Sequence, residues 1–424
     1  MPRSVDTPSH ILAVVHRSCS TQRCAFASTG RQRRSGWLLH AVPMDNELFP
    51  HKLPSVIPPA LVRRSTVGRS LLEDGVDSGR LTQVRRDVYV HVSCDADAWE
   101  QRAAVHSAML EAFRADALEG IVVLESAVLL HGGMTWRTPK SLHLAVRYRP
   151  AGLQRPPTRR DPMRPPSRDL GSRDRRRALA RRPVIRHHFP VPDQDIVVIG
   201  GLRVTGIERT IEDCARYLEP DAALVAVDSL FAVATGALPH GGVERSGPDD
   251  FDRPWDRAAE INQLAAVTRA RVLARLSKRR GERGVRRARA VIEAATPWSQ
   301  SPYETELRRI CLVNGITTPT PQMPLRTAFK TCYADLGWLN LRRAAEVDGL
   351  IKYVHDADTV EAKQSARDEL FVENGFEIAH FSPDDVLDSE RALEMLRALL
   401  PRTACEGRPV TGLRTKRERS QTHA

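Results

Sequence analysis

Four acidic residues near the C-terminal end of this 424-residue chain have a spacing that could bind a divalent metal ion. Glu346 and Asp348 are two residues apart in a short apolar segment, so a strand there would place both side chains on one face. Asp335 lies on the preceding apolar segment, and a turn near Asn340 would bring it alongside Glu346. Carboxylate oxygens grouped in this way suit a hard cation such as Mg²⁺ or Mn²⁺, which can activate a water molecule for hydrolysis.

The fourth acidic residue, Glu304, belongs to a predicted helix that begins after Ser301 and ends at Gly315. Ser301 is a favourable N-cap, Pro302 suits the first helical position, and Glu304 occupies the third position of a capping box. A purely structural interpretation stays open at this point. In it, Glu304 only caps its helix, Asp335 starts a turn, and the other two carboxylates lie on an exposed edge.

The elements that would position these carboxylates are predicted from apolar periodicity. Strands are expected over 333–338 and 344–349, antiparallel to each other, followed by a helix over 360–373 and a strand over 376–381. The expected order after residue 299 is therefore helix, strand, strand, helix, strand.

Residues 299–383 resemble the PD-(D/E)XK superfamily, and its Vsr-like endonucleases in particular. The matching residues are Ser301-Pro302-Tyr303-Glu304, Arg308, Gln322, Tyr333-Ala334-Asp335, Glu346-Val347-Asp348-Gly349, Arg367, Leu370 and Gly375. The resemblance implies that Asp335 and Glu346 bind the metal and that Glu304 supports the metal or a water. Asp348 stands where the family's Glu-x-Lys has lysine, and Lys352 is the candidate for the missing positive charge.

Residues 55–234 resemble the AbiEi-like antitoxins of type IV toxin–antitoxin systems. The matching segments are Val84-Arg85-Arg86-Asp87-Val88-Tyr89, Ser126-Ala127, Leu130-His131-Gly132, Leu142-His143-Leu144, Gly201-Leu202-Arg203-Val204-Thr205, Glu208-Arg209-Thr210-Ile211 and Asp213-Cys214-Ala215. The resemblance implies a DNA-binding winged helix-turn-helix over 44–95, an α/β domain over 96–234, and a toxin protein as a partner. A helix over 61–70 and a hairpin over 81–90 are expected. Either Arg85 and Arg86 of the hairpin contact phosphate, or the segment is a small helical cap whose arginines face solvent.

The net charge of +12 is concentrated in three segments without hydrophobic periodicity. Residues 1–43, 151–190 and 402–424 together carry +18, so the rest of the chain carries −6. We expect 1–43 to be disordered or non-native, with Met44 as a candidate start, 151–183 to be a disordered insertion, and 401–424 to be a disordered basic tail. Net charge alone is therefore weak support for nucleic-acid binding.

One basic segment lies within ordered sequence. After a linker over 235–257, a basic helical region is expected over 258–298, interrupted by Gly281 and Gly284. It carries ten Lys and Arg between Arg269 and Arg289. Either this face follows a nucleic-acid backbone or it is simply a solvated helix surface. The candidate phosphate-binding residues are Arg279, Arg280, Arg286 and Arg287.

The sequence as a whole predicts a multidomain, mixed α/β protein in the cytoplasm. It has no apolar run long enough to span a membrane, and its seven cysteines form no Cys-x-x-Cys pair for a zinc site. The primary expectation is a Mg²⁺-dependent endonuclease with a nuclease-like domain over 299–400. The alternatives are a non-enzymatic, antitoxin-like transcriptional regulator with a degenerate nuclease fold, and a protein that acts on RNA.

Overall fold

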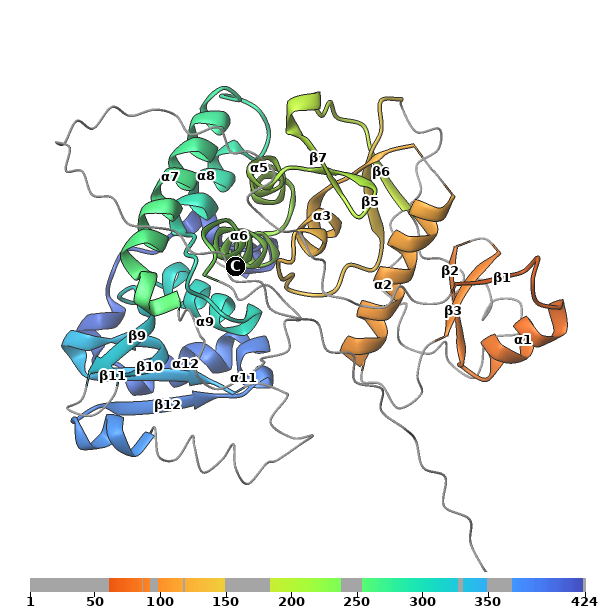
Figure 1. The fold of residues 1–424 in the computed structure, drawn as a ribbon. Coiled ribbons are helices and arrows are strands. Elements are labelled where there is room, and N and C mark those ends of the chain that lie inside the picture. The colour runs from red at the N-terminus through yellow and green to blue at the C-terminus, as the bar shows by residue number, and fades with distance from the viewer. Residues whose placement is uncertain are drawn as a thin grey trace, which may run out of the picture. The chain divides into compact units, whose positions relative to one another are not determined.

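The structure, a computed structural model, describes residues 61–85, 87–91, 98–116, 119–148, 184–237, 254–326, 331–348 and 368–421. All of them belong to the second of two compact units, His51–Ala424. The predicted extension over 1–43 and insertion over 151–183 lie outside the described residues. The described part is mixed α/β, as predicted, with strands in three separate sheets (Figure 1). None of its helices has the length and apolar character that crossing a membrane requires.

The first sheet has the order β1-β3-β2 and carries the predicted hairpin. Its elements are β1 Leu61–Arg63, α1 Arg69–Asp77, β2 Leu81–Arg85 and β3 Val88–His91. The helix predicted over 61–70 is wrong, because residues 61–63 pair with Val88–Val90 as a strand and the helix begins only at Arg69. A register shift between Gln83 and Arg85 lets both Leu81 and Val84 be buried, which strict alternation would not allow.

The second sheet has five strands in the order β6-β5-β4-β8-β7. Its elements are α2 Ala98–Ala115, β4 Ile121–Val122, α3 Leu124–Leu130, β5 Leu142–Ala145, β6 Val184–His187, η1 Asp193–Asp195, β7 Ile196–Ile199 and β8 Leu202–Thr205. The neighbours β4 and β8 are parallel, as are β5 and β6, whereas β4/β5 and β7/β8 are antiparallel.

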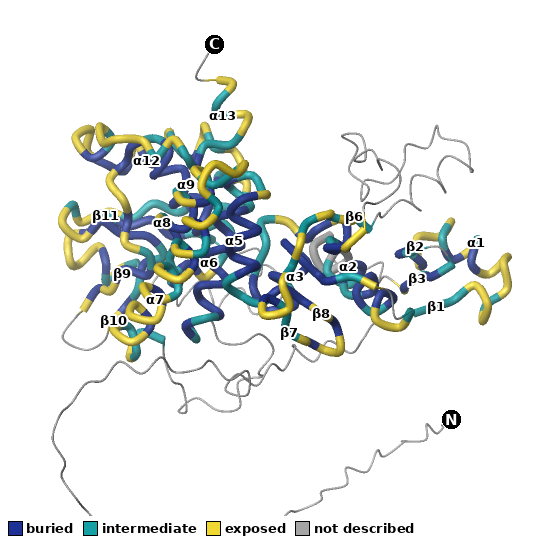
Figure 2. Tube along the Cα trace, turned by 90° about the horizontal axis from the view of Figure 1, so that it is seen from above, coloured by how far each residue is buried: buried dark blue, intermediate teal, exposed yellow. Residues whose placement is uncertain are grey.

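A group of helices follows the second sheet and forms the largest apolar core. It consists of α5 Ile207–Tyr217, α6 Pro220–Thr235, η2 Pro254–Arg257, α7 Ala258–Ser277 and α8 Val285–Ala294. The predicted break between α7 and α8 is confirmed, with Gly281 and Gly284 both at positive φ. The central helix α6 is buried along nearly its whole length (Figure 2). The core includes Ile121 of the second sheet and Leu312 and Val313 of the next helix, so it is continuous through this part of the chain.

The third sheet has the order β12-β11-β10-β9 and carries the candidate carboxylates. Its elements are α9 Pro302–Val313, β9 Thr320–Arg326, β10 Thr331–Trp338, η3 Leu339–Leu341, β11 Arg343–Val347, β12 Glu377–Phe381, α11 Pro383–Leu387 and α12 Ser389–Leu399. The predicted antiparallel pair and the final strand are confirmed, whereas β9 was not predicted as a strand. Of the helix predicted over 360–373, residues 368–373 are described and are helical.

The prediction of a disordered tail over 401–424 is wrong for residues 401–421. These residues form η5 Arg402–Cys405, η6 Thr411–Leu413 and α13 Lys416–Gln421. Leu413 is fully buried in the main core, and Glu418 pairs with the buried Arg309 of α9 at 2.8 Å. Gly407 donates to the carbonyl of Gly315 so closely that a Cβ on Gly315 would lie 2.2 Å from the Gly407 oxygen. These contacts involve only a few residues, so the basic composition of the segment did not indicate them.

Candidate active site

The first component of the candidate site is the N-terminal turn of α9, which fixes Glu304. Ser301 is the N-cap, as predicted, and its hydroxyl accepts a hydrogen bond from the Glu304 amide at 3.1 Å. The Glu304 carboxylate accepts from the amide of Gln300 at 2.9 Å, so it bonds to the residue before the predicted capping partner. The side chain is only 5% exposed. A carboxylate so deeply buried is more than a surface helix cap.

The second component is the pair of acidic residues on β10 and β11. The antiparallel register joins Leu336 to Ala345, and one further step sets Asp335 opposite Glu346. Asp335 accepts a hydrogen bond from the amide of Val347 at 2.8 Å, and Glu346 is 3% exposed. The structure therefore places these two predicted residues on adjacent strands at the same level of the sheet.

Gln322 on β9 joins the helix component to the sheet component. Its side-chain amide lies 3.4 Å from a carboxylate oxygen of Glu304 and 3.4 Å from one of Asp335. Gln322 is buried and has φ of +48°, a left-handed conformation that is strained for a residue with a Cβ. Strain of this kind is retained where the surroundings enforce it, often at functional sites.

The pKa of Glu304 reflects both its burial and the nearby carboxylate of Asp335. Burial, reinforced by the negative charge of Asp335, raises the pKa of Glu304 to about 8. Hydrogen bonds from Gln300 and Gln322 oppose this rise. The buried carboxylate of Glu304 and the partly buried carboxylate of Asp335 share one donor and repel each other, and a nearby cation would remove that repulsion. The arrangement consequently favours either a proton or a metal ion between them.

A histidine that was not singled out in the sequence lies beside the predicted Asp348. His380 of β12 pairs with Glu346 in the parallel register, so both side chains project from the same face of the sheet. Its Nε2 is 3.1 Å from Asp368, and its Nδ1 is 3.6 Å from Asp348. Only the strand position could have suggested His380, because its acidic neighbours are far away in sequence. Lys352, the predicted source of positive charge, lies outside the described residues.

The donors at this site suit an ion such as Mg²⁺, which keeps water ligands, better than a metal that protein side chains hold entirely. Within the described ranges, no three His, Cys, Asp or Glu side chains form a group that could hold a metal ion by themselves. Mg²⁺ usually keeps several water ligands and binds proteins through one or two carboxylates. Asp335 and Glu346 supply oxygen donors of that kind, with Glu304 and Gln322 next to Asp335.

Half of the arginines predicted to bind phosphate have partners within the chain. Arg85 pairs with Asp116 at 2.6 Å, Arg279 pairs with Glu212, and Arg287 donates to the carbonyl of Arg216 at 2.5 Å. Arg86 lies outside the described residues. Arg279 and Arg287 therefore bind to α5 itself, through the buried carboxylate of Glu212 and the carbonyl of Arg216.

Arg280 and Arg286 remain as candidates for phosphate contact. Both are exposed, and no ion pair within the described part of the chain includes either of them. They flank the turn between α7 and α8, where the exposed Arg283 also lies. We call this segment the α7–α8 turn. Its three exposed arginines, Arg280, Arg283 and Arg286, form a compact positive surface.

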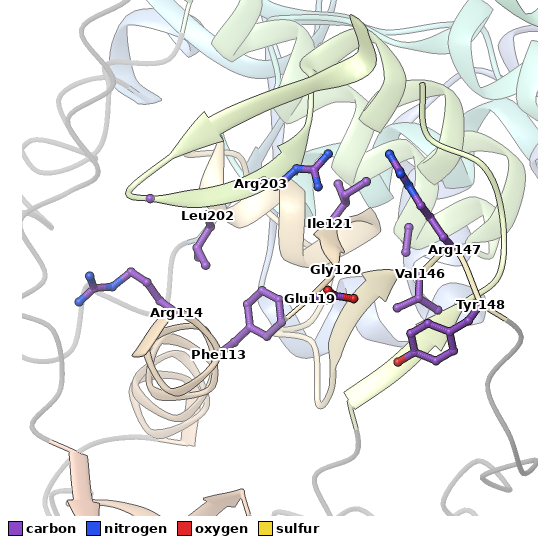
Figure 3. A pocket seen from close by; sticks show the side chains of 12 residues that line it. Phe113, Arg114, Glu119, Gly120, Ile121, Val146, Arg147, Tyr148, Leu202 and Arg203 are labelled. Atoms are coloured by element: carbon purple, nitrogen blue, oxygen red, sulfur yellow. The ribbon is translucent and has the colours of Figure 1, made fainter. Parts of the chain in front are cut away.

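A cavity of about 440 Å³ lies at one end of the five-stranded sheet (Figure 3). Arg114, Arg147 and Arg203 contribute to its lining, together with Glu119. The arginines already have acidic neighbours: Arg114 pairs with Glu111, and both Arg147 and Arg203 lie 3.6 Å from Asp193. Because its charges are compensated, this cavity lacks the electrostatic features that the carboxylate site has.

Comparison with known proteins adds no assignment to this geometry. No protein-family model matches the chain, and neither the curated proteins nor the solved structures include a significant match. The functional argument therefore depends on the site itself.

Proposed function

We propose that this chain is a divalent-metal-dependent endonuclease of the PD-(D/E)XK type that hydrolyses phosphodiester bonds in DNA. The observation that carries the proposal is the meeting of Glu304 and Asp335 at Gln322, with both carboxylate groups 3.4 Å from its amide. These residues come from a helix and two strands, and the cost of their mutual repulsion is difficult to explain as stabilisation alone. The resemblances to Vsr-like endonucleases and AbiEi-like antitoxins agree with this proposal and supply its choice of DNA.

In the proposed mechanism, Asp335 and Glu346 would hold Mg²⁺ or Mn²⁺. When bound, such an ion activates a water molecule and offsets the charge that develops on the phosphate. Glu304 holds a proton on its carboxylate near neutral pH when no cation is close, and it orients a water when that proton is lost. Asp348 is positioned by His380, which Asp368 in turn orients.

The nucleic-acid backbone would lie against the α7–α8 turn. Arg280 and Arg286 are exposed there and can contact phosphate oxygens without losing an internal ion pair. Arg279 and Arg287 instead support the turn from within, because their partners belong to α5 and the residues that follow it. Direct phosphate contact in this proposal is therefore made by Arg280 and Arg286, and Arg279 and Arg287 keep their internal partners.

The test is a cleavage assay on supercoiled plasmid DNA with Mg²⁺ or Mn²⁺, using the purified full chain. We expect nicked and linear products from the wild type and a loss of at least about 100-fold in Asp335→Asn and Glu346→Gln. Single-stranded RNA in a parallel arm distinguishes the two nucleic acids. Equal, background-level products from wild type and both variants on all substrates would refute the endonuclease proposal.

One observation favours a second function. Asp348 occupies the position of the family's lysine, so the site lacks that cation at its usual place. The second candidate is accordingly a non-enzymatic, antitoxin-like regulator that binds DNA, with a toxin protein as its partner. DNA binding that is unaffected by Asp335→Asn, in a protein that never cleaves, would favour this candidate.

A further inference from the structure

A single buried carboxylate on α6 forms hydrogen bonds to residues before and after Glu304. We call the N-terminal turn of α9, which holds Glu304, the Glu304 turn. Asp228 is 1% exposed and accepts from Arg308 at 2.6 Å, from the Thr305 hydroxyl at 3.0 Å and from the Ser299 hydroxyl at 3.2 Å. Its other oxygen accepts from the amide of Thr296 at 2.8 Å. All four donors come from the segment 296–308, which is distant in sequence from α6.

Two of these four donors precede Glu304 in the sequence and two follow it. Thr296 and Ser299 precede Gln300, whose amide bonds to the Glu304 carboxylate, and the other two donors follow Glu304 on α9. Arg308 also donates to the carbonyl of Ala294 at 2.6 Å, which fixes the end of α8 to the same point. The path from α8 into α9 is therefore held at one carboxylate.

We propose that Asp228 is a positioning residue for Glu304, through which the antitoxin-like half of the chain sets the geometry of the nuclease-like site. This inference rests on the proposed function for its catalytic consequence, but the positioning itself can be tested without activity. A carboxylate is suited to this task because its two oxygens accept four hydrogen bonds in fixed directions. A displacement of about 1 Å at a catalytic group can reduce a rate by about 100-fold.

A second contact joins the same two parts of the chain. Trp136, in the segment after α3, packs edge-on against Tyr303 with ring centroids 5.6 Å apart. Tyr303 is the neighbour of Glu304 in the first turn of α9. The first turn of α9 is thus held by Asp228 and by an aromatic contact from the upstream half of the chain.

The test compares Asp228→Asn and Arg308→Lys with the matched control Asp213→Asn. Asparagine can still accept from the Thr296 amide, but its NH₂ group cannot accept from Arg308, Thr305 or Ser299. Asp213 is a fully buried carboxylate on α5 that pairs with Arg209 of the same helix at 2.8 Å. Its substitution removes a buried charge of the same type without changing a bond to the 296–308 segment.

The primary readout is backbone hydrogen exchange, followed by mass spectrometry of peptides across the full chain. We expect exchange in peptides covering 296–308 to rise at least about tenfold in Asp228→Asn and Arg308→Lys, with smaller changes elsewhere. Asp213→Asn should leave these peptides at the wild-type rate. The kcat for plasmid cleavage should fall by about 10- to 100-fold in the first two variants, with little change in KM.

The outcomes separate the positioning role from the proposed function. Unchanged exchange over 296–308, or an equal rise in all three variants and in all peptides, would overturn the positioning role. If wild-type protein does not cleave DNA, the endonuclease proposal fails, and the exchange pattern still decides whether Asp228 fixes the Glu304 turn.

Discussion

Replacing Glu304 by glutamine should change how the stability of the protein depends on pH. The folded state raises the pKa of Glu304 from 4.5 to about 8, mainly through burial. Between these two values the folded state binds a proton that the unfolded state has released, so the wild type loses stability as pH rises. Glutamine has nearly the same shape, still accepts from the Gln300 amide, and does not ionise. The variant should therefore lack this loss.

The size of the effect follows from the separation of the two pKa values. Each pKa unit corresponds to about 1.4 kcal/mol, so the shift from 4.5 to about 8 sets an upper limit of about 5 kcal/mol. Local opening that admits water to the carboxylate reduces this figure. We expect Glu304→Gln to unfold like the wild type near pH 4.5 and to be more stable by about 2–4 kcal/mol near pH 9.

The assay is urea unfolding of both proteins across this pH range, with Glu293→Gln as the control. Glu293 is an acidic residue of α8 whose side chain is 53% exposed, so its substitution should leave the pH profile unchanged. Saturating Mg²⁺ should stabilise the wild type above about pH 8, because an ion that binds the folded state stabilises it by mass action. Parallel pH profiles for wild type and Glu304→Gln would show that Glu304 ionises normally, and the electrostatic argument for the site would be wrong.

Three further changes test separate parts of the structure. Arg280→Ala combined with Arg286→Ala should weaken DNA binding and make the salt dependence of log K less steep by about 2, as measured by fluorescence anisotropy; an unchanged slope would exclude phosphate contact. Leu413→Ala should lower the free energy of unfolding by about 2–5 kcal/mol because it creates a cavity in the core, and an unaffected urea midpoint would mean that residues 401–421 do not pack as described. His380→Ala should reduce cleavage by about 10- to 100-fold with an unchanged melting temperature, whereas full activity would remove His380 from the site.

Local signals predicted most of the elements between residues 258 and 381. The Ser301-Pro302 cap, the glycine breaks after α7 and the strands β10 and β11 depend on neighbouring residues, and each was confirmed. The opposition of Asp335 and Glu346 also follows from a short connection between two strands. These features are encoded within about ten residues of each other.

Long-range contacts explain what the sequence did not predict. Residues 61–63 form a strand because their backbone pairs with β3, which lies more than 20 residues later in the sequence. The last described residues fold because Leu413 and Glu418 find partners on α8 and α9, although their composition is typical of disorder. Asp228 and His380 likewise acquire their partners only in the folded chain, so their partners could not be predicted from neighbouring residues.

The continuous core around α6 also has a consequence for how the chain could be divided. Residues 238–253 separate α6 from η2 in sequence, yet α6 packs against α7 and α9 on the far side of that segment. A protein cleaved within 238–253 would therefore retain the buried side chains and the Asp228–Arg308 ion pair that join the two fragments. Neither fragment could bury its share of this surface alone. We infer that the two pieces would behave as a split protein that reassembles when they are expressed together.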